Sequence, residues 1–405
     1  MNLETLICAA ALAALGAAGA SPDARADADA RLVQATNDLG FRLYAALAPD
    51  ARSPNVFVSP LSVQLALAMV WNGAAGGTRA DMARSLGYAD LTAEDVNGAN
   101  RRAMAILREQ AAGVRTDIAN GLWGRAGVVF EPGFLARMRD DYEAEIASLD
   151  FRSPDAAGTI NGWVDRKTQG KIRQLVDARS VRDVMLVLVN ALYFNGRWTE
   201  PFPKAATKPQ PFSLLRGGSR EVPMMRVKRK FRYLRNDALQ AVRLPFGPRE
   251  QAAMYVLLPH PGRFETFARG LTAKACEEWI GAMRSAPGTV VLPRFRAEFG
   301  ASLVNALTRL GMGVAFGGAA NFAGLLPPGD PRAGDLYISD VVHKTVLEVN
   351  EEGAEAAAAT GVIVGLTAAA PAPPFEMVVD RPFAVLIRHE PTGQILFLGT
   401  IGDPR

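Results

Sequence analysis

The stretch VVHKTVLEVNEEGAEAAAATG, residues 341–361, joins a strand pattern to a run of alanines. Its first part alternates apolar and polar residues, as a half-buried strand does. The next strand pattern, FAVLIRH, begins only at Phe383, so residues 349–376 form a long connection. That connection starts acidic, becomes alanine-rich and then β-branched, and ends in prolines. A connection of this length needs an explanation in a compact protein.

Between Ala354 and Leu366, every second residue of this connection is small or apolar. Successive side chains of a strand point to opposite faces, so one set could be buried if the segment became a strand: Ala354, Ala356, Ala358, Thr360, Val362, Val364 and Leu366. The intervening set holds the only charge, that of Glu355. Alanine favours helices over strands, so we interpret the segment as a loop that contains a latent strand. From these residues alone, a short helix or a plain spacer is the alternative.

The composition is that of a globular protein, with 49% hydrophobic and 21% charged residues. The length of 405 residues suggests two or three domains, but no linker-like change of composition divides the chain. The net charge is +4, and the basic residues are scattered among acidic ones. This pattern favours a solvated basic surface over a nucleic-acid interface.

The N-terminal segment MNLETLICAAALAALGAAGA, residues 1–20, is predicted to be an export signal, since an apolar run leads to an A-x-A cleavage pattern at 18–20. It is atypical because it carries Glu4 and no Lys or Arg, so an alanine-rich frayed start is the alternative. Residues 21–29 are interpreted as a flexible lead-in and residues 30–405 as a single domain. We expect a secreted or periplasmic protein with no membrane-spanning segment.

Sequence motifs of enzymes, such as a nucleophile elbow, a Walker loop or a zinc-protease helix, are absent. The glycine-rich NGAAGGTR (72–79) follows a helical pattern and lacks the lysine of a phosphate-binding loop, so it is predicted to be a turn between helices. After signal cleavage only Cys276 of the two cysteines remains, which excludes an internal disulfide. Cys276 is predicted to be a buried helical residue. With three histidines and no metal-ligand spacing, we expect no metal and no cofactor.

The expected elements are mostly helices in the first half and strands in the second, which indicates an α+β fold. The apolar run MLVLVNALYFN (185–195) is predicted to be a central strand covered on both faces. Ser59 and Pro60 are predicted to cap and start a helix. Further elements are helices over 30–48, 92–112, 159–170 and 301–312, and strands over 116–127 and 288–299.

The chain resembles the serpin family over roughly residues 30–404. The stretch quoted first is similar to the strand and hinge that precede serpin reactive loops. Other similar stretches follow in family order: NVFVSPLSVQLALAMVWNGAAGGT (55–78), INGWVDRKTQGKI (160–172), LVNALYFNGRWTEPF (188–202), VPMMRVKRKFRY (222–233) and DRPFAVLIRHEPTGQILFLGTIGDP (380–404).

This resemblance implies a serpin fold of three β-sheets, about eight or nine helices and an exposed reactive loop at about 351–376. It implies a suicide inhibitor of serine or cysteine endopeptidases and not an enzyme. The protease cuts the loop and becomes covalently attached, and the freed hinge inserts into the large sheet as a new central strand. The implied partner is thus a protease in a covalent complex, with no nucleic acid and no membrane. The molecule is expected to be a monomer that can form loop–sheet polymers.

The resemblance to serpins assigns a role to each residue of the hinge in this sequence. Glu351 and Glu352 lie at the end of the sheet, Gly353 is the pivot, and Ala354 enters the sheet first. The stretch that follows comprises Glu355, Ala356, Ala357, Ala358, Ala359 and Thr360. Noninhibitory members often carry prolines or charges on the inward set, and this chain has neither. An active inhibitor is therefore expected, and a noninhibitory binding or chaperone-like serpin is the alternative.

The reactive bond implied by the usual hinge length is Thr367–Ala368, with Leu366–Thr367 as runner-up and cleavage among residues 368–370 as a further alternative. Each choice places a small or aliphatic residue before the cut, which suits an elastase-like or subtilisin-like protease, or a chymotrypsin-like one at Leu366. A trypsin-like target is not expected, because no Arg or Lys lies between Lys344 and Arg381.

Two further groups of residues are implied by the resemblance. The first is the shutter, where the sheet strands part: Ser59, Ser62, Asn190 and His343. His343 shares a strand face with Thr345, Leu347 and Val349, so it should be buried, and Asn190 is its candidate hydrogen-bond partner. The second is the breach at the top of the sheet: Trp198, Arg294 and Glu351, the last two forming an ion pair.

A heparin-binding helix occurs in some serpins. Four arginines lie in the corresponding region among acidic residues and are interpreted as a solvated face: Arg101, Arg102, Arg108 and Arg115.

Overall fold

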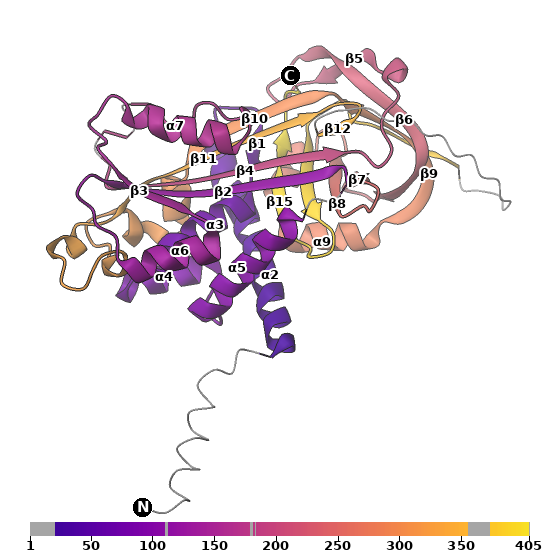
Figure 1. Cartoon of the computed structure of the whole chain (residues 1–405). Coiled ribbons are helices and arrows are strands. Elements are labelled where there is room, and N and C mark those ends of the chain that lie inside the picture. Colours follow the sequence, from indigo (N-terminus) through magenta and orange to yellow (C-terminus); the bar gives the residue numbers. More distant parts are fainter. Residues whose placement is uncertain (1–20, 110–111, 179–180, 183, 355–372, 405) are drawn as a thin grey trace, which may run out of the picture.

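The computed structural model describes residues 21–109, 112–178, 181–182, 184–354 and 373–404. These residues form a mixed α+β fold in which helices cover a six-stranded sheet and a nine-stranded run of strands lies at one end (Figure 1). The strand order of the six-stranded sheet is β10–β11–β4–β2–β3, with the short β12 also on β4. The bounds are β2 Val114–Arg125, β3 Glu145–Leu149, β4 Leu186–Arg197, β10 Phe295–Ser302, β11 Ile338–Val349 and β12 Gly353–Ala354.

Strand β4 is central and covered on both faces, as the apolar run predicts. Its alternate residues enter two hydrophobic clusters. Leu186 and Leu188 belong to the main core, whereas Val187 and Val189 belong to a second cluster that includes Trp163 of α7. In Figure 1, α7 lies on one side of the sheet and α3, α5 and α6 lie on the other.

The remaining strands follow the order β1–β15–β14–β8–β7–β6–β9–β13, with β5 paired to β6. The long β6 pairs with β9 through Met224–Tyr233 and passes to β7 through Tyr233–Arg235. The nine-stranded run can be divided where β6 changes its partner from β9 to β7, and it then forms two sheets. Together with the six-stranded sheet these are the three expected sheets, so that prediction is confirmed. The bounds are β1 Val56–Val58, β5 Lys208–Ser213, β6 Ser219–Arg235, β7 Leu239–Phe246, β8 Ala252–Pro259, β9 Arg284–Pro293, β13 Phe375–Val378, β14 Phe383–His389 and β15 Ile395–Ile401.

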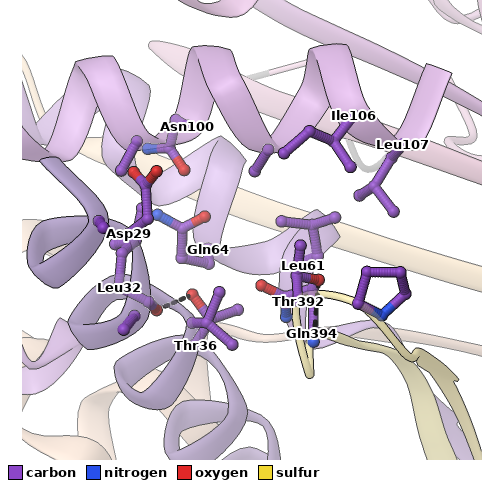
Figure 2. A pocket seen from close by; sticks show the side chains of 16 residues that line it. Asp29, Leu32, Thr36, Leu61, Gln64, Asn100, Ile106, Leu107, Thr392 and Gln394 are labelled. Atoms are coloured by element: carbon purple, nitrogen blue, oxygen red, sulfur yellow. Dashed lines mark hydrogen bonds between the residues drawn. The ribbon is translucent and has the colours of Figure 1, made fainter. Parts of the chain in front are cut away.

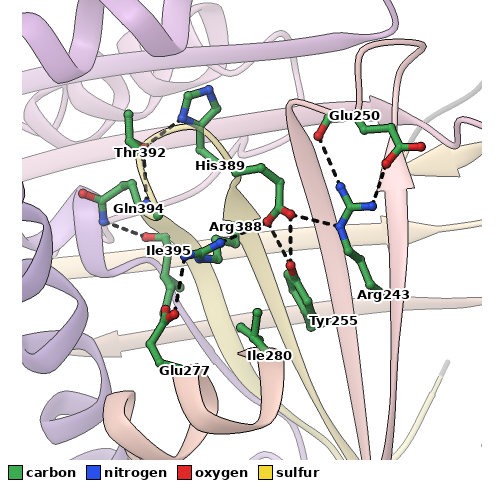
Figure 3. A network of polar contacts seen from close by, with 12 residues as sticks. Arg243, Glu250, Tyr255, Glu277, Ile280, Arg388, His389, Thr392, Gln394 and Ile395 are labelled. Carbon is green, nitrogen blue, oxygen red and sulfur yellow. Dashed lines mark hydrogen bonds and ion pairs between the residues drawn. The ribbon is translucent and has the colours of Figure 1, made fainter. Parts of the chain in front are cut away.

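A polar network ties β7, β8 and β14 together (Figure 3). Arg243 Nε lies 2.9 Å from Glu390 Oε2, and Arg243 Nη1 lies 2.6 Å from Glu250 Oε2. The Tyr255 hydroxyl donates to both oxygens of Glu390 at 3.0 Å. Burial, together with the Glu390 carboxylate, raises the pKa of Tyr255 to about 12. These strands are therefore joined by side chains as well as by their backbone ladders.

The first helix, α2 (Pro22–Leu47), begins earlier than predicted. The flexible lead-in expected over residues 21–29 is therefore wrong. Ser21 caps the helix by accepting a hydrogen bond from the backbone of Ala24, and Pro22 occupies the first turn. Asp29, about two turns further along α2, forms an ion pair with Arg102 of α5 at 2.6 Å, which anchors the N-terminal part of the helix to the domain. The predicted signal, residues 1–20, lies outside the described residues.

The described residues contain nine α-helices, within the expected number. After α2 these are α3 Pro60–Trp71, α4 Gly76–Leu86, α5 Ala93–Arg108, α6 Pro132–Tyr142, α7 Ala156–Lys167, α8 Phe264–Arg269, α9 Ala273–Ala282 and α10 Val304–Leu307. Ser59 caps α3 and Pro60 begins it, as predicted. A turn joins α3 to α4 as predicted, but it covers only residues 72–75 of the expected 72–79, because α4 already begins at Gly76. Cys276 is buried in α9. None of the described helices is long and apolar enough to cross a membrane.

Several predicted boundaries are wrong. α5 and α7 each end about one turn early. The strand predicted over 288–299 is two strands, β9 and β10, which belong to different sheets and meet at Arg294. The helix predicted over 301–312 is α-helical only over Val304–Leu307 and continues as a π-helical turn that contains Gly311 at φ 100°. That left-handed conformation interrupts regular helix geometry, and glycine is the residue that tolerates it.

Candidate functional site

The six-stranded sheet contains an open slot between its two parallel central strands. β11 pairs with β4 only through Ile338–Val342 and Leu186–Val189. Beyond this ladder β11 still pairs with β10 and β4 still pairs with β2. The described residues show no pairing between the facing edges over 343–349 and 190–195. Unpaired strand edges are ready templates for another strand.

The top of this slot is already closed by the first hinge residues. β12 pairs antiparallel with β4, placing Gly353 opposite Arg197 and Ala354 opposite Gly196. Gly353 has a φ of 145°, and a Cβ on it would lie 2.1 Å from the carbonyl oxygen of Gly196. Only glycine fits so close to another backbone. The predicted pivot thus lies where the chain turns back into the sheet.

The turn before β12 is held by backbone and amide contacts. Asn350 Oδ1 accepts hydrogen bonds from the backbone of Glu352 at 2.9 Å and of Gly353 at 3.2 Å. Trp198 Nε1 donates to the carbonyl of Asn350 at 2.9 Å, and its backbone donates to Glu352. The Trp198 ring stacks on Phe246 with centroids 4.5 Å apart. Trp198 therefore lies at the top of the slot and supports the turn, as the resemblance implied.

Glu351 is buried at 7% exposure and forms the expected ion pair with Arg294, but at a long 3.8 Å. Its closer partner is Thr207, whose hydroxyl donates to Glu351 Oε1 at 2.8 Å. The backbone of Phe202 also donates to the Glu351 carbonyl at 2.8 Å. The sequence reasoning missed Thr207, because nothing in the local pattern marks it.

At the bottom of the slot His343 is buried at 2% exposure, as its strand face predicts. Its Nε2 accepts a hydrogen bond from the backbone of Ser59 at 3.2 Å. Burial lowers the pKa of His343 to about 4. The prediction that Asn190 is the partner of His343 is wrong, since the N-terminus of α3 presents a backbone donor there instead.

Asn190 belongs to a separate chain of polar contacts. Its Oδ1 accepts from the Ser62 hydroxyl, and its Nδ2 donates to Asn120 Oδ1. Asn120 in turn donates to the carbonyl of Tyr142 at 2.7 Å. The four predicted shutter residues thus meet where the β4–β11 ladder ends, and Asn120 of β2 is a further member that the sequence did not indicate.

The outer side of the slot is covered by side chains. The cavity there measures only about 20 Å³ and lies among Ile172, Tyr193 and Val346. Lys171, which follows α7, lies 3.4 Å from Glu348 of β11 and bridges the covering segment to the slot. A strand that entered the slot would have to displace these contacts.

The remaining predicted residues fall into two groups. Each of the four arginines is paired with a carboxylate, as a solvated mixed-charge face requires: Arg101 with Asp141, Arg102 with Asp29, Arg108 with Glu143 and Arg115 with Asp117. The rest of the hinge and both candidate bonds lie outside the described residues: Glu355, Ala356, Ala357, Ala358, Ala359, Thr360, Leu366, Thr367 and Ala368. Within the part of the chain that the structure describes, no cluster of His, Cys, Asp and Glu is arranged to hold a metal.

The family model of the serpins, which are serine protease inhibitors, matches residues 34–404 of this chain. The chain belongs to the serpin family. It is 38% identical to leukocyte elastase inhibitor of Bos taurus, over 89% of this chain and 96% of that protein. It is 34% identical to Serpin-Z2B of Triticum aestivum, over 90% of this chain and 94% of that protein.

Among solved structures, the serpin is similar to human thyroxine-binding globulin complexed with its ligand, with a TM-score of 0.85 and 25% identity over 93% of this chain and 99% of that one. It is also similar to the thermophilic serpin tengpin in its native state, with a TM-score of 0.81 and 28% identity over 92% and 94% of the two chains. The chain therefore belongs to a family of protease inhibitors and not to a family of enzymes.

Proposed function

We propose that this serpin is a suicide inhibitor of a serine protease. The nucleophilic oxygen of the protease attacks the carbonyl carbon of Thr367, an ester bond forms, and the bond to the nitrogen of Ala368 breaks, releasing a new amino terminus. The residues before the cut then insert into the slot between β4 and β11. The protease stays attached as the acyl ester and is carried with the strand.

The observation that carries this proposal is the register of β12. Its antiparallel pairing with β4 is the orientation expected of a chain that turns back after β11, because β11 runs parallel to β4. Continued from Ala354 opposite Gly196, the register sets Ala356 opposite Phe194 and Ala358 opposite Leu192. Directly opposed residues share a face, and Phe194 and Leu192 both lie in the main core. The inward positions are thus the small residues that the sequence pattern picked out.

The same register places Thr360 opposite Asn190, where the open part of the slot ends. The next inward residue, Val362, would lie opposite Leu188, which is already paired with Val341. Further insertion therefore requires the β4–β11 ladder to part. The contacts of Ser59, Ser62, Asn190 and His343 hold this point closed in the uncut molecule.

Insertion of the cut segment is expected to lower the free energy of the molecule. A full new strand gains roughly a dozen net backbone hydrogen bonds at about 0.5–1.5 kcal/mol each, on the order of ten kcal/mol. Small apolar side chains on the inward face add burial without a desolvation penalty, whereas a charge there would cost several kcal/mol. The uncut fold is thus metastable with respect to the inserted one.

An elastase-like or subtilisin-like protease is the proposed target. The residues around the bond are small or aliphatic, and several relatives are leukocyte elastase inhibitors. We also propose that residues 1–20 direct export, so the mature chain would begin at Ser21. The mass of the protein recovered outside the producing cells checks this, and an uncleaved chain retained inside would contradict it.

The direct test is to mix the full chain with elastase and, separately, with subtilisin and trypsin. We expect an SDS-resistant complex with elastase or subtilisin, and mass spectrometry should locate the cut after Thr367 or Leu366. Rapid cleavage with no complex would favour the alternative, a noninhibitory binding serpin. A stable complex with trypsin alone would overturn the proposed target class.

A further inference from the structure

A cavity of about 290 Å³ lies between α2, α3, α5 and the turn that joins β14 to β15 (Figure 2). No residue of the slot lines it. Most of its wall is aliphatic, and the side chains of Leu61 and Leu107 lie at the end toward Thr392 and Gln394. At the opposite end Figure 2 shows two fully buried carboxamides, those of Gln64 and Asn100.

The carboxamide of Asn100 leaves its oxygen without a partner. Asn100 Nδ2 donates to the Tyr142 hydroxyl at 3.3 Å. That hydroxyl donates its own proton to Asn97 Oδ1 at 2.7 Å, so toward Asn100 it can only accept. The orientation of the amide is fixed by this chain, and Asn100 Oδ1 has no hydrogen bond. Figure 2 shows this oxygen on the side that faces the middle of the cavity.

Gln64 on α3 also has an amide oxygen without a partner. Its Nε2 donates to the Tyr88 hydroxyl at 2.6 Å, and its Oε1 is buried with no hydrogen bond. In Figure 2 this oxygen also faces the middle of the cavity. A buried acceptor without a partner is costly and uncommon in native proteins. Two of them at one end of one cavity point to donors supplied from outside the chain.

The rim of the cavity carries no net charge to attract an ion. Asp29 is the acidic residue of the lining, and Arg102 binds it through Nε at 2.9 Å and Nη2 at 2.6 Å. A neutral ligand is therefore favoured over a charged one. Water alone would satisfy the two oxygens but would leave the aliphatic wall hydrated, which is unfavourable.

We propose that this cavity binds a small neutral molecule with an apolar body and two hydrogen-bond donors at one end. An apolar cavity of about 150 Å³ holds benzene, so the space of about 290 Å³ suits a molecule with two fused rings. The apolar body contacts Leu61 and Leu107, and the two donors reach Gln64 Oε1 and Asn100 Oδ1.

Calorimetric titration of the full chain with naphthoresorcinol and with its dimethyl ether tests the proposal. The two probes share a fused ring, but only the diol carries donors. We expect the diol to bind roughly tenfold tighter or more, because two hydrogen bonds distinguish the probes. Equal affinities, or no binding of either probe, would overturn the assignment of the two oxygens.

Variants on α5 test the location. Ala103→Phe fills the cavity and should abolish binding of both probes, whereas Ala105→Phe, an exposed position outside the lining, should leave binding unchanged. Asn100→Leu should weaken the diol roughly three- to tenfold and leave the ether unaffected. If Asn100→Leu does not fold, the pair of phenylalanine variants still decides. Binding retained by Ala103→Phe would place the ligand elsewhere.

Discussion

In the sheet region around β14 that strand has a hydrogen-bonded neighbour along both edges, β15 on one side and β8 on the other. In the six-stranded sheet, β4 keeps its β2 partner throughout but loses β11 beyond Val189. The first region adds the network of Arg243, Tyr255 and Glu390 across its strands. The two regions use the same backbone chemistry, yet only the second leaves edge groups that a further strand can satisfy. Of these two regions, we therefore expect only the six-stranded sheet to gain stability by accepting a further strand after the chain has folded.

The largest expected effect follows cleavage of the loop. If the cut segment enters the slot, about ten kcal/mol of added stability should raise the unfolding temperature by roughly 10 °C or more. Calorimetry before and after limited cleavage by the target protease measures this shift. An unchanged unfolding temperature would mean that the slot stays open, and the contrast between the two sheets would lose its functional meaning.

The next effect separates the two faces of the inserted strand. Ala356→Arg places a charge opposite Phe194 in the core and should convert the inhibitor into a substrate, because burial of the charge costs several kcal/mol. Glu355→Arg, on the outward face and opposite Asn195 in the same register, is the control and should keep most of the inhibition. The number of inhibitor molecules consumed per protease trapped is the measurement. Equal behaviour of the two variants would contradict the register extended from β12.

Acid should weaken the closed end of the slot. Burial lowers the pKa of His343 from 6.5 to about 4, so the unfolded chain binds a proton in this range while the folded chain does not. Stability is therefore complete above pH 6.5 and falls as the pH drops toward 4, by about 3 kcal/mol in all.

Denaturant unfolding of the wild type and of His343→Gln over this range measures the effect. Burial also lowers the pKa of His389, so the variant should flatten the profile only in part. A variant whose pH profile matches that of the wild type would show that His343 is not the group responsible.

A smaller effect concerns the top of the slot. Thr207→Val removes the close donor to the buried Glu351 and should cost about 1–2 kcal/mol of stability. Arg294→Gln is the comparison, and it should cost less than about 1 kcal/mol because Arg294 is half exposed and its pair is long. Denaturant midpoints of both variants measure the difference. A larger loss of stability in Arg294→Gln than in Thr207→Val would instead make the ion pair the main support of Glu351.

The smallest effect belongs to the fully paired region. Tyr255→Phe removes one donor from Glu390 but leaves Arg243 in place, so a loss of about 1 kcal/mol of stability is expected. Inhibition stoichiometry should stay that of the wild type, because these strands do not part during insertion. A change in stoichiometry would show that the two sheets are mechanically coupled.

Sequence reasoning succeeded where the signal was local. The cap at Ser59, the buried face of His343 and the central apolar strand all follow from residues next to one another. It failed where a partner comes from a distant element. Thr207 and Asn120 carry no local mark, and the first turns of α2 are held by Arg102 from another helix. The hinge beyond Ala354 was assigned by pattern, and the position of β12 supplies the register that the pattern lacked.

The pairing of Ala354 with Gly196 also gives the starting point from which the length of the inserted segment can be measured. Thr367 lies thirteen positions further along the chain, and a strand advances about 3.3 Å per residue, so an attached protease would travel roughly 43 Å from the top of the sheet. Deleting two residues between these points would shorten that path by about 7 Å and keep every side chain on its face. Deleting one would exchange the faces of every residue beyond the deletion. The length of the loop therefore sets how far the attached protease is moved. It also decides whether the inserted strand places its small side chains on the inward face.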